Sequence, residues 1–348
     1  MDETRFSQII NDMDGMKVGV LGDFFLDLYL SMDRSLSELS LETNLEAFQV
    51  NQITAQPGAA GVVAKNLTSL GAEVSAFAVI GADGFGYELQ QALKNNQINV
   101  DSVVTGDEVF TPTYIKPMMK EISGSVVELN RVDVKNRSAL PLRLEEELIR
   151  SLRARIQDLD GLLVAEQVRQ DGTGTITRNV RDLLFELSKQ YPEKIFGVDS
   201  RHFSAQYRGV FLKVNLKEAC RTLESIKPGA VEKIPDSPLP AAQYCQQVLY
   251  QHYQKPVFIT LGDQGISGQD AQGPFHHPGV QLEGPLDIVG AGDAVLAGIG
   301  LVLSTGGSSS EAAYLGNLIG SLIVQQLGTT GIVDRKMLKE RYLMYQQQ

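Results

Sequence analysis

The chain has 348 residues, and its 42 Asp and Glu outnumber its 31 Lys and Arg, which gives a formal net charge of −11. Its length and its 43% of apolar residues are ordinary for one large α/β domain, or two smaller ones, around a buried core. The negative charge disfavours non-specific binding to nucleic acid or to an anionic membrane surface, because both would repel the chain.

The N-terminal residues do not have the pattern of an export signal, so we expect no export. Residues 1–4 are acidic where a signal peptide would be basic and then apolar. Cys220 and Cys245 are too few for a disulfide framework, so we expect reduced thiols and a cytoplasmic protein. The most apolar stretch, residues 288–303, carries an acid and falls short of the run of about 20 apolar residues that spans a bilayer.

A strand–helix–strand rhythm runs along the chain. Residues 18–21 are a β-branched apolar run, as expected for a buried parallel strand, and residues 61–70 have helical periodicity before Gly71. Alternation of this kind predicts a parallel sheet with helices on both faces. Further strands are expected at 74–80, 159–165, 195–198 and 256–261, and a further helix at 180–190.

Two stretches, near residues 31–56 and 109–133, interrupt this rhythm. In the second, a Ser123-Gly124 turn signal separates two apolar runs and resembles a β-hairpin. We expect both stretches to form a small β lid within a single domain, residues 1–348. Exposed edges and an apolar face on such a lid favour a homodimer. Its charged side chains Lys116, Lys120 and Arg131 could bind a substrate phosphate, but charges on an exposed hairpin are usually solvated, and we interpret them so.

The strongest chemical signal is the run from Asp287 to Asp293, which leads into an apolar, small-residue helix. Backbone N–H groups of Gly290, Ala291 and Gly292 at a helix start can converge on a phosphate, and the helix dipole adds to the attraction. A carboxylate repels phosphate, so an acid here makes sense if Asp293 takes a proton from an attacking hydroxyl. The alternative is that Asp293 is an acid in the first turn of the helix with no catalytic role, and local composition alone does not separate these two interpretations.

A second run of small residues, Pro57-Gly58-Ala59-Ala60-Gly61, precedes the expected helix at 61–70. Such residues let a ligand approach the backbone closely. Tight packing of the helix on the sheet would explain them equally well.

Both runs resemble the two signature regions of the ribokinase-like (PfkB) carbohydrate kinases, and the resemblance covers nearly the whole chain. It implies a ribokinase-like three-layer α/β/α sandwich with a mostly parallel central sheet and a small β-sheet lid. It also implies ATP-dependent phosphorylation of a hydroxyl of a sugar or sugar phosphate, with ATP, Mg²⁺ and an optional K⁺ as cofactors. The Arg131-x-Asp133 pair and Tyr207-Arg208-Gly209 look closest to the heptose-phosphate kinase branch.

The resemblance implies further roles for residues outside the glycine run. Gly22-Asp23 with Leu26-Asp27 resembles the family's first strand, whose terminal acid binds sugar hydroxyls, so Asp27, together with Gly58 and Ala59, would bind the sugar. Asn215 with Glu218 is similar to the N-x-x-E motif, in which Glu218 would hold magnesium through water. The nucleotide would be bound by the T-x-G-x-x-G turn, which contains Thr260, Gly262 and Gly265. Asn317 would lie near the adenine, and Asp287 would bind a monovalent cation. Simpler readings stay open: a turn cap for Asp27, a capping box for Asn215 with Glu218, and a local hydrogen bond for Asn317.

The chain departs from the family where the acceptor would bind. Ala59 stands where the family has a second glycine, and Val62 where it has an asparagine, so a sugar contact is lost. A nucleoside or other polyol kinase is therefore an alternative. So is a sugar- or nucleotide-binding regulator without turnover, although the retained Asp293 argues against it.

Overall fold

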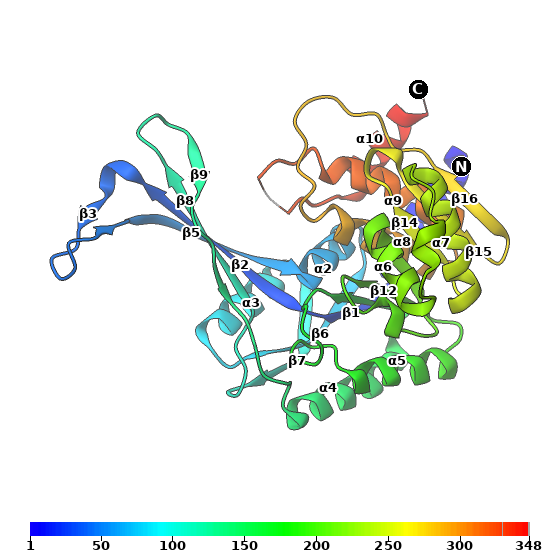
Figure 1. The fold of residues 1–348 in the computed structure, drawn as a ribbon, viewed down its shortest axis with the longest axis horizontal. Coiled ribbons are helices and arrows are strands. Elements are labelled where there is room, and N and C mark those ends of the chain that lie inside the picture. The colour runs from blue at the N-terminus through cyan, green and yellow to red at the C-terminus, as the bar shows by residue number, and fades with distance from the viewer. Residues whose placement is uncertain (329, 347–348) are drawn as a thin grey trace.

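A nine-stranded central sheet forms the core of the computed structural model, which describes residues 1–328 and 330–346 (Figure 1). Its order is β16-β15-β14-β13-β12-β11-β1-β6-β7. The pairs from β7 to β14 are parallel, and only β15 and β16 are antiparallel. The strands are β1 (Lys17–Gly22), β6 (Glu73–Gly81), β7 (Ile98–Gly106), β11 (Gly161–Glu166), β12 (Ile195–Ser200), β13 (Phe211–Asn215), β14 (Val257–Thr260), β15 (Ile266–Asp270) and β16 (Gly273–His277).

Helices cover both faces of this sheet and bury it. One apolar core includes side chains of α1, α2, α3, α8, α9 and α10, and two further cores on the other face include those of α4 and α5 and of α6 and α7. Among the described residues, no helix combines the length and the apolar character needed to cross a membrane. The helices are α1 (Glu3–Asp12), α2 (Ala60–Ser69), α3 (Gly84–Asn95), α4 (Leu142–Arg155), α5 (Arg178–Gln190), α6 (Leu216–Ile226), α7 (Pro238–Tyr253), α8 (Ala291–Ser304), α9 (Ser309–Ile323) and α10 (Arg335–Tyr345).

The predicted three-layer α/β/α architecture is confirmed. Along β6, alternate side chains enter opposite cores: Ala76 and Ala78 enter one, and Phe77 enters the other. Strand β13 was not foreseen, because Lys213 interrupts its short apolar run. Its neighbours β12 and β14 lie at the predicted places.

A second, mixed sheet projects from the core as a lid, with β3 near its far end in Figure 1. The predicted hairpin is confirmed by the antiparallel pairing of β8 with β9, with Gly124 in its turn at a φ of +88°. The lid strands begin at Phe24 and return to Ala59, so they extend beyond the expected segment 31–56. The lid comprises β2 (Phe24–Asp33), β5 (Val50–Ala59), β8 (Thr113–Lys120), β9 (Val126–Glu128) and β10 (Val132–Val134), with a small pair β3 (Glu38–Leu39) and β4 (Glu46–Ala47).

Candidate active site

The candidate active site lies where α8 begins, above the carboxyl ends of β11, β12 and β13. Gly290 precedes the helix with a φ of +77°, a left-handed conformation that a residue with a Cβ adopts at a cost. The helix start is thereby turned so that Ala291 and Gly292 form its first turn together with Asp293. The expected phosphate cradle therefore has the backbone geometry of a helix N-terminus.

Asp293 has the properties of a base that works near neutral pH. The side-chain amide of Gln167, just after β11, donates a hydrogen bond of 3.1 Å to Asp293 Oδ1. Burial and the nearby carboxylate of Asp199 raise the pKa of Asp293 to about 7, against the opposing charges of Lys213 and Arg201. A carboxyl group with a pKa close to ambient pH is suited to proton transfer.

Lys213 was not identified from the sequence, yet it lies beside the glycine turn. Its ammonium nitrogen is 2.5 Å from Asp199 Oδ2, and a Cβ placed on Gly292 would lie 2.9 Å from it. Burial opposes its charge, but Asp199 outweighs that effect and the pKa of Lys213 is raised. A permanent positive charge thus lies next to the predicted anion hole. The sequence feature that could have identified Lys213 is its place as a single lysine inside an otherwise apolar strand.

Asn215 and Glu218 form a capping box at the start of α6. The Glu218 backbone N–H donates to Asn215 Oδ1 at 3.0 Å, and the Asn215 N–H donates to Glu218 Oε2 at 2.9 Å. Burial and Asp199 raise the pKa of Glu218. The structural reading of this motif is confirmed, and the magnesium role stays a prediction compatible with it, because a carboxylate has several acceptor positions.

The nucleotide-side turn follows β14 as expected. Thr260 ends the strand opposite Asn215, and Gly262 and Gly265 have φ values of +62° and +86°. A Cβ on Gly265 would collide with the backbone carbonyl of His277, so this position requires glycine. The contacts of these residues with a nucleotide stay a prediction.

Asn317 and Asp287 make local hydrogen bonds. Asn317 Nδ2 donates to the Pro278 carbonyl at 2.6 Å, which is the simpler reading of this residue. Asp287 accepts from the backbone N–H groups of Val289 at 3.0 Å and of Gly328 at 3.1 Å. The predicted roles near adenine and a monovalent cation are untested by these contacts.

Asp27 lies on the lid and not, as the sequence indicated, at the end of the first core strand. Core strand β1 ends at Gly22, and the chain enters lid strand β2 at Phe24. Asp23 occupies the strand end instead, and its carboxylate accepts three backbone N–H bonds from residues 167, 168 and 175. The interpretation of the strand was wrong because the core and lid strands follow each other without an intervening loop.

The lid surrounds Asp27 with specific partners. Lys116 Nζ on β8 is 3.1 Å from Asp27 Oδ1 and also bonds the hydroxyl of Tyr29. On β5, a Cβ at Gly58 would lie 2.8 Å from Asp27 Oδ2, so glycine leaves room for the carboxylate. The reading of Lys116 as solvated was wrong, since its side chain is only 12% exposed, whereas Lys120 is 59% exposed.

The two signature regions meet at the starts of α2 and α8. Val62 is buried, and its Cγ1 would lie 3.3 Å from a Cβ on Gly290. Ala59, just before α2, has φ +52° and ψ −118°, backbone angles that are natural for glycine alone. The two departures from the family pattern therefore lie at the site itself.

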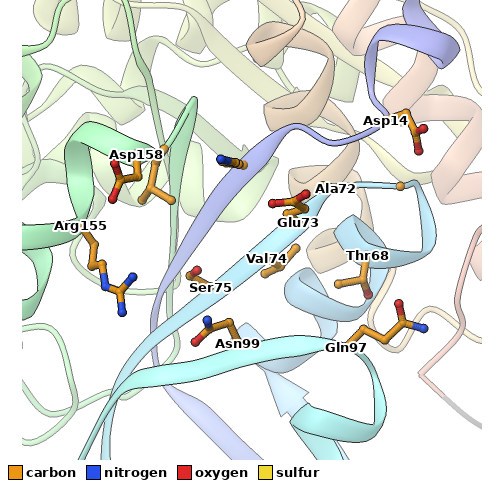
Figure 2. Close-up of a pocket in the computed structure, with 13 residues that line it drawn as sticks. Asp14, Thr68, Ala72, Glu73, Val74, Ser75, Gln97, Asn99, Arg155 and Asp158 are labelled. Carbon is orange, nitrogen blue, oxygen red and sulfur yellow. The ribbon is translucent and has the colours of Figure 1, made fainter.

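Two large cavities lie at opposite ends of the core strands. One, of about 610 Å³, lies at the amino ends, where Glu73, Arg155 and Asp158 line it, and contains none of the predicted site residues (Figure 2). The other, of about 660 Å³, contains Gln167 and lies between the carboxyl ends and the lid. Ligands of open α/β sheets bind at the carboxyl ends, which favours the second. Within the described residues, no group of three or more His, Cys, Asp or Glu could hold a metal by itself.

The core, the lid and the acid at a glycine-lined helix start define a ribokinase-like protein. The chain belongs to the pfkB family of carbohydrate kinases, as the resemblance implied, with residues 20–118 and 211–335 matching the family.

Solved structures share this fold. Phosphofructokinase-2 from Escherichia coli, solved with fructose-6-phosphate, matches with a TM-score of 0.68 at 17% identity over 95% of this chain and 99% of that one. The same enzyme has been solved with potassium, with a TM-score of 0.67 at 17% identity over 96% of this chain and 99% of that one. Ribokinase from Arabidopsis thaliana, solved with ribose and ATP, matches with a TM-score of 0.65 at 16% identity over 94% and 98% of the two chains.

Among curated relatives, the bifunctional protein HldE of Caulobacter vibrioides is 29% identical over 321 residues. That match covers 90% of this chain and 61% of the relative, so the chain spans less than two thirds of the relative's length.

Proposed function

We propose that this protein transfers a phosphoryl group from ATP to a hydroxyl group of a sugar or sugar phosphate, with Asp293 as the general base. The observation that carries the proposal is the position of Asp293 in the first turn of α8. There it combines a pKa of about 7 with the adjacent charge of Lys213 and a glycine-lined backbone. A carboxylate at a phosphate-binding helix start would repel the phosphate, so its position favours a role as the base that deprotonates an acceptor beside the nucleotide.

Each part of the site has a proposed task. Asp27, with Gly58 and Ala59 beside it, orients the acceptor, and the lid excludes water. Asp293 removes the hydroxyl proton, and the backbone N–H groups of residues 290–292 stabilise charge on the transferred phosphoryl group. Magnesium would neutralise charge on the nucleotide phosphates, and the carboxylate of Glu218, close to Asp199 and Lys213, suits an ion held through water.

Known relatives support the choice of substrate class. The structural neighbours solved with ribose and ATP and with fructose-6-phosphate are sugar kinases of the same fold. Similarity to HldE favours a heptose-phosphate-like acceptor. The neighbour solved with potassium supports an optional potassium ion, for which Asp287 would be one partner.

The test is ATP consumption measured against a panel of sugars, sugar phosphates and nucleosides. Turnover with a sugar or its phosphate supports the proposal. Turnover with nucleosides alone favours the nucleoside kinase, and ATP binding without turnover on any acceptor favours the silent regulator. The cytoplasmic location and the single kinase domain over residues 1–348 stay predictions.

A homodimer through the lid is a separate proposal. Apolar side chains are exposed to water along the lid, which is unfavourable, and pairing with a second copy of the chain would bury them. Light scattering that finds a monomer at assay concentration would remove this proposal. The exposed side chains are Leu36, Leu39, Leu41, Leu45, Phe48, Val50, Ile53, Ile122, Val126, Val127 and Val132.

A further inference from the structure

A third cavity, of about 380 Å³, lies where lid strand β5 joins the core. Its walls come from residues 55–57 of β5, Lys65 of α2, the end of α3, and residues 326 and 330–332 of the loop after α9. None of the residues that line it belongs to the cavity that contains Gln167. Its volume is that of a site for a small molecule.

A buried lysine lines this cavity. Among the described residues of the lining, Lys65 alone is charged, and it is only 5% exposed. Its ammonium donates a hydrogen bond of 3.2 Å to Oγ1 of Thr330, which also lines the cavity. In the described part of the chain that is the one hydrogen bond that the ammonium makes, although it has three donors. The remaining donors are available to a ligand.

The charge of Lys65 has no counter-charge of its own. Within residues 1–328 and 330–346 it forms no ion pair. The acid whose charge acts on it is Asp27, and Asp27 is already paired with Lys116 at 3.1 Å. Burial lowers the pKa of Lys65, because the charged form is unfavourable away from water. A bound anion would supply the missing counter-charge.

The wall beside this lysine is held in place by specific hydrogen bonds. Asn66, the next residue of α2, donates to the Gly331 carbonyl at 3.3 Å and accepts from the Val333 N–H at 3.1 Å. Gln326 donates to the Ile332 carbonyl at 2.9 Å and accepts from the Ile332 N–H at 3.1 Å. Residues 331–333 are therefore fixed against α2 before a ligand binds, which lowers the entropic cost of binding.

The other polar groups of the lining indicate the kind of anion. One ammonium neutralises one carboxylate, whereas a doubly charged phosphate would keep a charge without a partner. Carboxamides both donate and accept hydrogen bonds, as hydroxyl groups do. Outside the loop, the lining carries the carboxamides of Gln56, Asn95 and Asn96. The cavity therefore suits a small molecule with one carboxylate and several hydroxyl groups.

We propose that this cavity is a second ligand site, which binds a small hydroxylated monocarboxylate through the ammonium of Lys65. The site adjoins both halves of the proposed active site. Strand β5 continues from the cavity to Gly58, and Thr330 Cβ would lie 3.6 Å from a Cβ placed on Gly290. A ligand in the cavity would thus contact lid and core together. The inference goes beyond the proposed kinase activity and does not depend on it.

The test is calorimetry without ATP, with gluconate and glycerate as probes and with sorbitol and glycerol as their uncharged counterparts. We expect at least one of the two carboxylates to bind the wild type, and neither polyol to bind. Lys65→Met should weaken the binding at least about tenfold, because a hydrogen bond between charged groups is lost. Lys94→Met, which removes an exposed lysine of α3, is the matched control and should bind as the wild type does.

Asn95→Asp is a second variant, which decides the question if Lys65→Met does not fold. Asn95 is exposed at the end of α3, so we expect the fold to tolerate the change while the new negative charge repels the carboxylate. A carboxylate that binds should raise the melting temperature of the wild type and of Lys94→Met more than that of either cavity variant.

Full binding by a folded Lys65→Met or Asn95→Asp variant overturns the inference. So does a wild type that binds neither carboxylate, or that binds the polyols equally well. Turnover of ATP does not enter these measurements, so a failure here leaves the proposed kinase function standing, and an inactive protein that binds gluconate at Lys65 still supports the second site.

Discussion

Lys213 and Asp199 form an ion pair at the carboxyl ends of adjacent strands, with 2.5 Å between Nζ and Oδ2. Their side chains are only 4% and 13% exposed, so each charge depends on the other for its stability. The same ammonium lies against Gly292 in the proposed anion hole. The pair therefore links the stability of the core to the charge of the site.

We predict that Lys213→Met lowers kcat about 100-fold, the effect of losing one preorganised donor to a developing negative charge. It also lowers the melting temperature, because Asp199 is left buried without a partner. Adding Asp199→Asn should restore the melting temperature and leave kcat low. Recovery of kcat in the double variant would show that Lys213 has only a structural role.

We predict that Asp293→Asn lowers kcat by about 100- to 10,000-fold and leaves ATP binding intact, because only the proton acceptor is lost. Steady-state kinetics and calorimetry with ATP check this. Full turnover in the variant would rule out the base assignment.

The activity should depend on pH through Asp293. Its carboxyl group must be ionised to accept a proton, so kcat/KM should fall about tenfold per unit below pH 7 and level off above it. A flat profile from pH 5.5 to 8 would contradict the assignment.

The same raised pKa has a consequence for stability. A carboxyl group whose pKa is about 7 when folded, against about 3.9 when unfolded, stabilises the fold below the lower value and loses that contribution as the pH rises through 7. Asp293→Asn should therefore melt at a higher temperature than the wild type at pH 8, with a smaller difference at pH 5. A constant difference between the two proteins across this range would contradict the raised pKa.

We predict that Ala59→Gly raises the free energy of unfolding by about 1 kcal/mol or more, because alanine is strained at φ +52° and ψ −118°. Ala64→Gly, inside α2, is the matched control and should lower it by about 1 kcal/mol. Chemical denaturation measures both. Equal destabilisation by the two changes would show that Ala59 is not strained.

We predict that Gly58→Ala raises KM for the acceptor about tenfold and leaves KM for ATP unchanged, because the new methyl group would displace the carboxylate of Asp27. Gly84→Ala is the control, since a Cβ at Gly84, the first residue of α3, meets no other atom within 4 Å. An unchanged acceptor KM in Gly58→Ala would place Asp27 outside the acceptor site.

Much of the fold was predictable from local patterns. Strands such as β1 and β11 are continuous apolar runs, and the turn at Gly124 marks the lid hairpin. The helix start before Asp293 was visible because glycines and an acid stand together in one short segment. Strand β13 and the position of Asp27 were missed, since a charged residue in a short strand and a strand-to-strand junction give no periodic signal.

The sequence by itself predicted the family, the layered architecture and a candidate base, because each depends on residues that are close together along the chain. Only the tertiary structure brought Lys213 to Gly292, Lys116 to Asp27, and Lys65 to Thr330. These pairings join residues far apart in sequence. Lys213 lies beside Gly292 because α8 begins above the edge at which the parallel strands end, and Lys116 lies beside Asp27 because β8 pairs with β2 in the lid.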